Sequence, residues 1–184
     1  MRPVARNEIV DYATYENQRE AFRRDVLAAK EPRRVHVAGF FTLLFENRLT
    51  VRYQVQEMMR VERIVREAEI QHEIDTYNEL LGGAGELGCT LLIEIDDAAE
   101  RAEKLAAWRG LPERFYVALA DGRRVHARMD HRQEDERRIS SVHYLKFATG
   151  GAVPVAVGVD YPGIEAESAL DERQQAALRA DLAT

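Results

Sequence analysis

The chain has 184 residues, 46% of them hydrophobic, with 26 Lys and Arg against 32 Asp and Glu for a net charge of −6. A chain of this length buries roughly 70% of its unfolded surface around one core, so we expect residues 1–184 to form a single domain. The acidic balance argues against a nonspecific grip on nucleic acid or on an anionic membrane.

The sequence also lacks the signals that would direct it to or through a membrane. Its first ten residues, "MRPVARNEIV", have no apolar core of the kind found in signal peptides, and no run approaches the ~20 apolar residues of a membrane span. We therefore expect a cytoplasmic protein. The single cysteine, Cys89, lies in the apolar run "GCTLLIEI", which is typical of a buried core residue rather than of a disulfide or a cysteine-based metal cluster.

In the first half of the chain, the patterns predict helix, strand and helix in turn. An N-terminal helical segment occupies residues 1–33, with apolar residues on one face of a helix from Thr14 to Lys30 that ends before Pro32. The run "VHVAGFFTLLFEN" predicts one bent strand or a hairpin about Gly39. A long helix then extends from Arg48 to Leu81, roughly 50 Å if unbroken, and "GGAGELG" ends it.

In the second half, strand signals dominate. "CTLLIEI" predicts a central strand, and "DDAAERAEKLAAW" a helix with an Asp cap. Two alternating arms about Asp121-Gly122 predict a hairpin with a type I′ turn. After an exposed linker, residues 131–138, come a strand at 139–149 and an edge strand containing Pro154. The inward-facing residues of the hairpin are predicted to be Phe115, Val117, Leu119, Val125, Ala127 and Met129.

A C-terminal helix within residues 165–184, starting at Glu165 or Asp171 and ending at Leu182, closes the chain. Together these elements predict an α+β fold: a mostly antiparallel sheet packed against one long central helix and shorter flanking helices.

The predicted long helix carries an unusual distribution of charge. Its first half is mainly basic and its second half mainly acidic, which opposes the helix macrodipole by up to ~1 kcal/mol per group near the ends. Its apolar residues fall into two offset stripes, Val51, Val55, Met58 and Val65 and then Ile70, Ile74, Tyr77 and Leu81. Either ion pairs with neighbouring elements or a bound partner must supply the opposing charges. We predict a recognition surface on this helix, made of Arg52, Gln56, Glu57, Arg60, Glu62 and Arg63.

A metal site is a second hypothesis for the same helix. Glu69 and His72 have the i, i+3 spacing that places a carboxylate and an imidazole on one helical face, and Glu62 lies two turns earlier. Such ligands suit iron, manganese or zinc. A complete site needs further ligands from another histidine or another subunit. On this hypothesis the protein is a metal-binding protein or enzyme acting on peroxide or a small oxidised substrate.

Two further patterns occur in the sequence. Arg124, His126 and Arg128 alternate outward on the hairpin, so with Arg52 and Arg60 they offer a site for a small anion. "GAGELG" matches a dinucleotide fingerprint, but a helix enters it and a strand leaves, which is the reverse of the context that binds phosphate.

Four segments resemble an uncharacterised bacterial family, domain of unknown function 3501: "LLFENRLTVRYQVQEMMRVERI", "HEIDTYNELL", "CTLLIEI" and "VHYLKF". The resemblance covers about residues 34–147. It implies genes beside rubrerythrin and an iron-sulfur oxidoreductase, and so an accessory role with a redox protein partner in peroxide stress. It implies no catalytic residues. With the wide apolar helix face, it leads us to expect a homo-oligomer.

Overall fold

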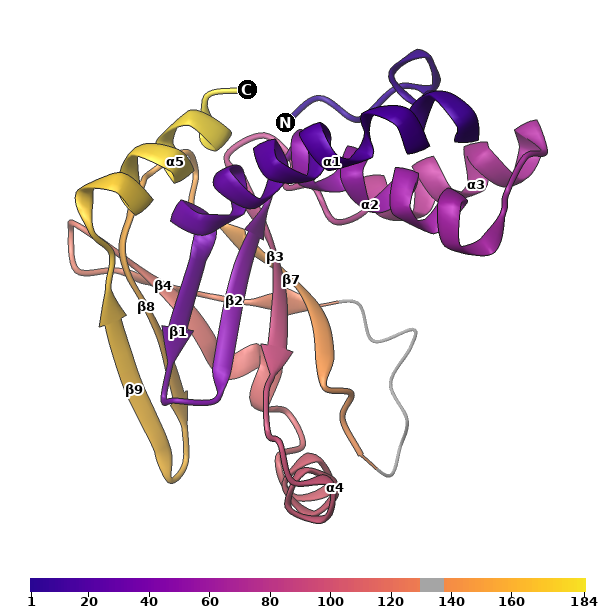
Figure 1. Ribbon diagram of the computed structural model, residues 1–184. Helices are drawn as coiled ribbons and strands as arrows, with labels where there is room; N and C mark the ends of the chain where they lie inside the picture. Colours follow the sequence, from indigo (N-terminus) through magenta and orange to yellow (C-terminus); the bar gives the residue numbers. More distant parts are fainter. Residues whose placement is uncertain (130–137) are drawn as a thin grey trace.

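The computed structural model describes residues 1–129 and 138–184, so most of the predicted linker lies outside the described residues. Two antiparallel sheets lie beneath a layer of helices (Figure 1). The helices are α1 Tyr12–Lys30, α2 Arg48–Glu62, α3 Glu67–Asn78, α4 Ala98–Ala107 and α5 Glu172–Leu182, with short 3-10 turns η1 Arg6–Glu8, η2 Glu31–Arg33 and η3 Leu111–Arg114. The strands are β1 Arg34–Val37, β2 Phe41–Glu46, β3 Glu86–Ile93, β4 Phe115–Leu119, β5 Arg124–His126, β6 Arg128–Met129, β7 Val142–Ala148, β8 Pro154–Tyr161 and β9 Ile164–Ala169.

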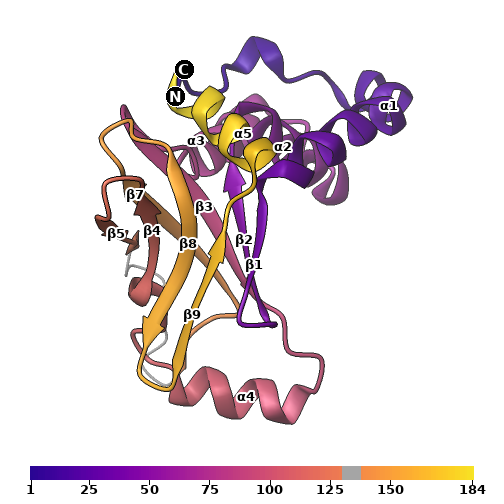
Figure 2. The same cartoon turned by 90° about the vertical axis from the view of Figure 1, so that its left-hand side faces the viewer.

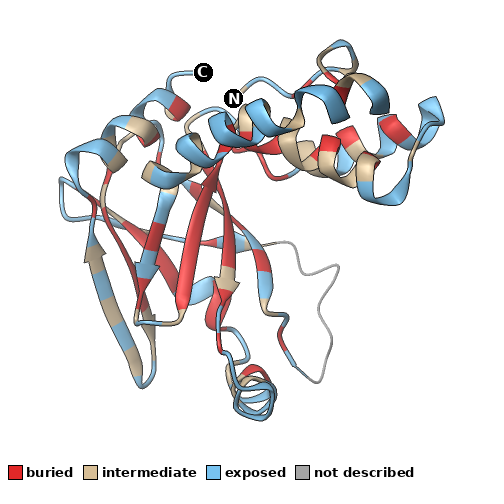
Figure 3. Ribbon diagram, viewed as in Figure 1, coloured by how far each residue is buried: buried red, intermediate tan, exposed pale blue. Residues whose placement is uncertain are grey.

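The two sheets face one another across the main core. One has the order β1-β2-β3-β7-β6 and the other β5-β4-β8-β9, and the chain passes between them at Ala127, whose N–H donates to the Phe115 carbonyl at 2.8 Å. Figure 2 shows the sheets edge-on, with α4 at one end and the other helices at the opposite end. Burial concentrates on β2 and β3 (Figure 3): Phe41, Leu43 and Phe45 of β2 point into the space between the sheets, and the alternate residues of β2 are buried on its other face. The α+β prediction is therefore confirmed.

The open end of this core is closed by α4 and an aromatic cluster. Trp108, at the end of α4, stacks on Phe40 with ring centres 5.3 Å apart, and Phe41 packs against both rings. The Lys104 ammonium lies 5.0 Å from the centre of the Phe40 ring. Asp97 caps α4 as predicted, accepting from the Glu100 N–H at 2.8 Å.

The prediction of one continuous helix over 48–81 is wrong. α2 ends at Glu62, and Arg63 takes the left-handed conformation with φ 55° and ψ 40°. The Ile64 N–H then donates to the Met59 carbonyl at 2.9 Å, a bond that closes the end of a helix when its next residue is left-handed. The chain reverses, and α3 packs back on α2 in a second apolar cluster with Val51, Val55, Met59, Ile70 and Ile74.

The reversal accounts for part of the charge pattern and of the offset apolar stripes. Glu67 and Glu69 lie in the first turn of α3, where carboxylates are stabilised by the helix dipole, and Arg60 lies in the last turn of α2. The charges at the outer ends still oppose the dipole, because Arg48 begins α2 and no basic residue lies in the last turn of α3. Val51 and Val55 of the first stripe face Ile70 and Ile74 of the second, whereas Val65 is exposed.

Most strand predictions are confirmed, with three corrections. β1 and β2 form the hairpin about Gly39, and β3 is the central strand of its sheet. The turn at Asp121-Gly122 is not type I′, because only Gly122 has positive φ, and a three-residue loop joins Leu119 to Arg123. β8 is not an edge strand: Pro154 is its first residue, where a missing N–H is tolerated.

The third correction concerns the C-terminal helix. Residues 164–169 form β9, so the helix starts from the later of the two predicted caps, Asp171, which accepts from the Gln174 N–H at 2.7 Å. Of the residues that the structure describes, none belongs to a helix long and apolar enough to cross a bilayer.

The glycine-rich segment after α3 serves a close backbone crossing. A Cβ added at Gly88 would overlap the Leu80 carbonyl oxygen, and one at Gly82 would overlap the Glu86 carbonyl. Two glycines of the apparent nucleotide fingerprint have other roles, since Gly85 adopts φ 70° and the Gly83 N–H donates to the Glu86 carboxylate at 3.2 Å. The motif therefore lets the chain cross β3 without a side chain between the two backbones.

Substituting Gly88→Ala should lower the free energy of unfolding by roughly 1–3 kcal/mol, because backbone atoms must move to admit the methyl group. Urea denaturation followed by circular dichroism measures this. Gly83→Ala is the matched control, since its Cβ would meet only the mobile end of the Glu86 side chain at 3.1 Å. Equal losses in the two variants would contradict the crossing argument.

Arg63→Gly should instead raise stability by up to ~1 kcal/mol, because glycine adopts the left-handed conformation without the cost that a Cβ imposes. Glu62→Gly, one residue earlier and still helical, should lower stability by about as much. Thermal unfolding of both variants tests this opposite pair of signs, and a loss of stability in Arg63→Gly would show that the side chain holds the reversal.

Candidate functional site

Gln56, in the predicted recognition surface, ties the N-terminal segment to α2. Its side chain is only 1% exposed, accepts from the Val10 N–H at 2.8 Å and donates to the Val10 carbonyl at 3.2 Å. Asn78 on α3 does the same to Val4, at 2.8 and 2.9 Å. Two amides thus replace the missing backbone partners of residues 4 and 10, and Gln56 faces inward rather than toward a partner.

Glu57 and Arg60 attach α1 to α2. The Glu57 carboxylate accepts from the Tyr15 hydroxyl at 2.6 Å and from the Arg19 Nε at 2.7 Å, while Arg60 donates to Glu16 at 2.9 Å. Burial acts to raise the pKa of Glu57, but the hydrogen bonds from Arg19 and Tyr15 outweigh it and lower that pKa below its ordinary value. Burial, and then the Glu57 carboxylate, raise the pKa of Tyr15. The ion pairs within the chain supply the opposing charges.

The other three residues of the predicted surface lie apart. Arg52 places its guanidinium 4.9 Å from the centre of the Phe22 ring, and its buried Nε has no partner among the described residues. Glu62 and Arg63 are exposed at the end of α2. The six residues therefore divide between an inward face of α2 and its tip, and their role in binding stays a prediction.

The reversal separates one of the three predicted metal ligands from the other two. Glu69 and His72 keep their i, i+3 spacing on α3, whereas Glu62 belongs to α2, and all three residues are exposed. Glu69 lies 3.4 Å from Arg66, a cation. Within residues 1–129 and 138–184, no three His, Cys, Asp or Glu side chains converge as a metal ion requires. Iron, manganese or zinc binding at these residues stays an untested prediction.

The predicted basic strip on the hairpin is neutralised by acidic residues. Arg124 lies 3.6 Å from Glu167, the His126 Nε2 lies 2.8 Å from Asp160, and Arg128 pairs with Glu86. Each of these side chains faces a carboxylate on a strand two or three positions away in its sheet, so the strip has little charge left for a free anion. Tyr116 also donates to Glu167, at 2.8 Å, and burial together with this bond raises the pKa of Tyr116 to about 12.

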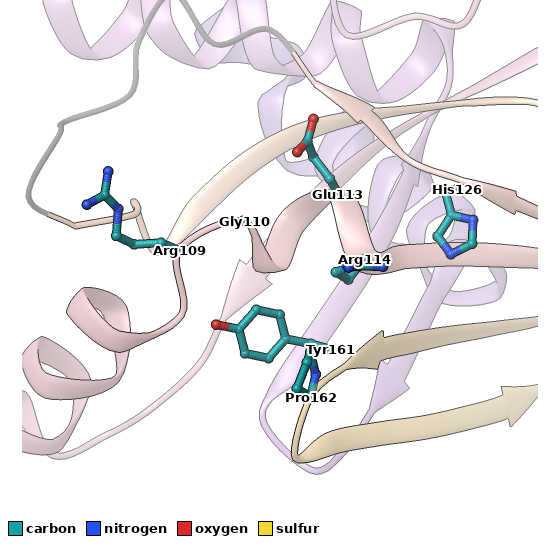
Figure 4. Close-up of a pocket in the computed structure, with 7 residues that line it drawn as sticks. All are labelled: Arg109, Gly110, Glu113, Arg114, His126, Tyr161 and Pro162. Atoms are coloured by element: carbon teal, nitrogen blue, oxygen red, sulfur yellow. The ribbon is translucent and has the colours of Figure 1, made fainter.

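A pocket of about 580 Å³ lies beside this network, lined by Arg109, Gly110, Glu113, Arg114, His126, Tyr161 and Pro162. Figure 4 shows the Tyr161 ring between Arg109 and Arg114. The Tyr161 hydroxyl donates to the Ala107 carbonyl at 3.3 Å, which fixes the ring. Asp160 lies 4.0 Å from Arg114 and also bonds His126, so opposite charges are close to balance here.

A second pocket, of about 490 Å³, lies where η2, β1 and α5 meet. Nothing in the sequence predicts this pocket beyond the alternation that places Arg34 and His36 on one face of β1, because its walls come from segments more than 130 residues apart. Its polar groups are less evenly balanced than those of the first pocket.

Two buried reactive groups belong to the sheet. Cys89 is a core residue of β3, as predicted, and burial raises the pKa of its thiol well above the ordinary value, which opposes thiolate chemistry. Glu46 is only 7% exposed and accepts from the Thr50 and Thr90 hydroxyls at 2.5 and 2.7 Å. These bonds link the first turn of α2 to β2 and β3.

The described geometry can be set beside known proteins. A sequence model described as protein of unknown function (DUF3501) matches residues 3–182, nearly the whole chain. The chain belongs to the DUF3501 family. The structure of this DUF3501 protein is similar to a crystal structure, at 1.90 Å resolution, of a novel protein of unknown function from Burkholderia pseudomallei K96243. The TM-score is 0.91 at 30% identity, over 98% of this chain and 100% of that one. No curated protein matches the sequence.

For the attachment of α1, Glu57→Gln should lower stability by about 1–3 kcal/mol near neutral pH, the range for hydrogen bonds to a charged group. A carboxylate whose folded pKa is lowered stabilises the fold above its unfolded pKa, and that contribution disappears as pH falls through the folded value. The difference between wild type and variant should therefore shrink below about pH 4.

Urea denaturation at several pH values measures this difference. Glu20→Gln is the matched control, because the Glu20 side chain is 75% exposed and lies 3.4 Å from the same Arg19. Its effect should be close to zero at every pH. A pH-independent loss in Glu57→Gln would mean that shape, rather than charge, holds α1 in place.

Proposed function

We propose that this DUF3501 protein is an accessory binding protein that docks a redox protein partner at the tip of the α2–α3 hairpin. The tip consists of Val61, Glu62, Arg63, Val65 and Arg66. The proposed partner is rubrerythrin or an iron-sulfur oxidoreductase of a peroxide-stress system, as the family resemblance implies.

The observation that carries the proposal is the exposure of two valines at the tip. Val61 is 68% exposed and Val65 is 74% exposed, in a chain whose other branched residues mostly enter one of its two cores. A buried apolar anchor surrounded by polar groups is the usual centre of a protein interface. The valines flank Arg63, which adopts the left-handed conformation. This conformation is unfavourable for a residue with a Cβ, and such strained residues are often found at functional sites.

The charges around the valines define what a partner must present. The Arg63 side chain has no ion-pair partner among the described residues, and the Arg66 side chain is 81% exposed with only a 3.4 Å contact to Glu69. A partner with an apolar depression rimmed by carboxylates would complement this arrangement. Gln56, Glu57 and Arg60 contribute indirectly, because they hold α2 against α1 and the N-terminal segment behind the tip.

The test is titration of the immobilised protein with purified rubrerythrin and, separately, with the purified iron-sulfur oxidoreductase from the same organism. Val61→Asp with Val65→Asp should weaken binding at least about tenfold, since burying the new carboxylates is unfavourable. Leu27→Asp is the matched control: Leu27 is 48% exposed at the far end of α1 and should leave the affinity unchanged.

Two outcomes would contradict the proposal. One is the absence of binding by wild type to either partner; the other is an equal loss of affinity in the tip variant and in Leu27→Asp. Light scattering of wild type and tip variant tests the predicted homo-oligomer in the same samples. A wild-type oligomer that dissociates in the variant would assign the tip to a second copy of this chain instead.

A further inference from the structure

The second pocket gathers cations that no carboxylate of the described chain neutralises. Six of its lining residues are ionisable: Lys30, Glu31, Arg34, His36, Asp171 and Arg173. Figure 1 shows the end of α1, the start of β1 and the start of α5 converging at one corner of the molecule. Both acidic residues are engaged, because Glu31 pairs with Arg173 at 2.5 Å and Asp171 accepts from the first turn of α5.

Lys30 and Arg34 are therefore the cations without an ion-pair partner, in a lining that carries three cations and two carboxylates. Within the described residues, the Lys30 ammonium contacts only the Tyr53 ring, 5.5 Å from its centre, and the Arg34 side chain has neither a hydrogen bond nor an ion pair. This differs from the hairpin arginines and from Arg60, each of which faces a carboxylate. An unpaired guanidinium and an ammonium lining one concave site favour a ligand with negatively charged oxygens.

His36 adds a group whose tautomer is set by a chain of hydrogen bonds. The Thr42 hydroxyl, buried at 1% exposure, donates to the Glu94 carboxylate at 2.5 Å. Its one hydrogen is thereby used, so it accepts from the His36 Nδ1–H, 2.9 Å away. The neutral ring then carries its lone pair on Nε2, which has no partner in the described chain. Nε2 is free to take a proton and donate it to a ligand.

We propose that this pocket binds a small oxyanion, a phosphate or carboxylate group, between Lys30 and Arg34, and that His36 takes up a proton at Nε2 as the ligand binds. The anion itself favours the imidazolium. The other charged groups around the ring are Lys30, Arg34, Arg173, Glu31 and Asp171 in the pocket, and Glu94 behind Thr42. The bound anion makes protonation favourable, so binding strengthens as pH falls.

The site is independent of the tip proposed for docking. Glu16 bonds Arg60 near the start of α1, and Phe22 contacts Tyr53 one and a half turns later, so α1 and α2 are antiparallel. The pocket lies at the end of α1, and the tip lies at the end of α2, the opposite end of this helix pair. Loss of either activity leaves the other testable.

Isothermal titration of the intact protein with sodium sulfate, at low ionic strength and at about pH 6 and about pH 8, tests the proposal, because the charge of sulfate is constant over this range while histidine titrates. Wild type should bind more tightly at the lower pH. Arg34→Gln should weaken binding about tenfold at both values, as expected for the loss of one charged hydrogen bond. His36→Gln should remove the difference between the two pH values.

Three further measurements make the result decisive. Arg109→Gln, at the other pocket, is the matched control and should bind as wild type does. Thr42→Val should keep the fold but change the histidine tautomer, seen in the ¹⁵N shifts of His36. Phosphate and succinate titrated at about pH 8 distinguish a tetrahedral ligand from a carboxylate. Two results would overturn the proposal. One is that the wild type binds none of sulfate, phosphate and succinate; the other is that Arg34→Gln and Arg109→Gln lose affinity equally.

Discussion

The arrangement of the helices depends on one backbone reversal, in which Arg63 turns left-handed and the Met59 carbonyl accepts from Ile64. Because of it, α3 lies against α2, and Val51, Val55 and Met59 pack on Ile70 and Ile74 instead of lying along one continuous helix. The N-terminal segment can then bridge both helices through Gln56 and Asn78. The exposed tip exists for the same reason, since a continuous helix would have had no end at this point.

The polar side chains of α2 illustrate how a crowded helix can hold few binding groups. Gln56, Glu57 and Arg60 bond to neighbouring elements, each with a partner 42 to 46 residues away in the sequence. The cations available to a ligand, Lys30 and Arg34, lie elsewhere, in a part of the sequence where the pattern of charges predicts no site. Whether a charged residue is free thus depends on the folded neighbours and not on the number of charges near it.

The sequence predicted most of the elements whose decisive contacts are local. Alternation located the hairpins, although not the turn type at Asp121-Gly122. Asp97 marked the start of α4, and Asp171 was one of two candidates for the start of α5, because a cap bonds a residue three positions away. It failed at Arg63, where neither glycine nor proline marks the break and long-range packing of α3 decides it. The candidate sites were harder still: the groups around His36 converge only once the first and last thirds of the chain are folded together.

Because the apolar interior is divided into two clusters, fluorescence and circular dichroism report on the unfolding of different parts of the molecule. The only tryptophan, Trp108, is stacked in the aromatic cluster of the sheets, far from the helix pair around Met59. Its fluorescence therefore follows the sheets alone, whereas far-ultraviolet dichroism is dominated by helix. Coincident transitions would mean one cooperative unit, and an earlier loss of dichroism would identify the helical layer as a separate foldon that opens first.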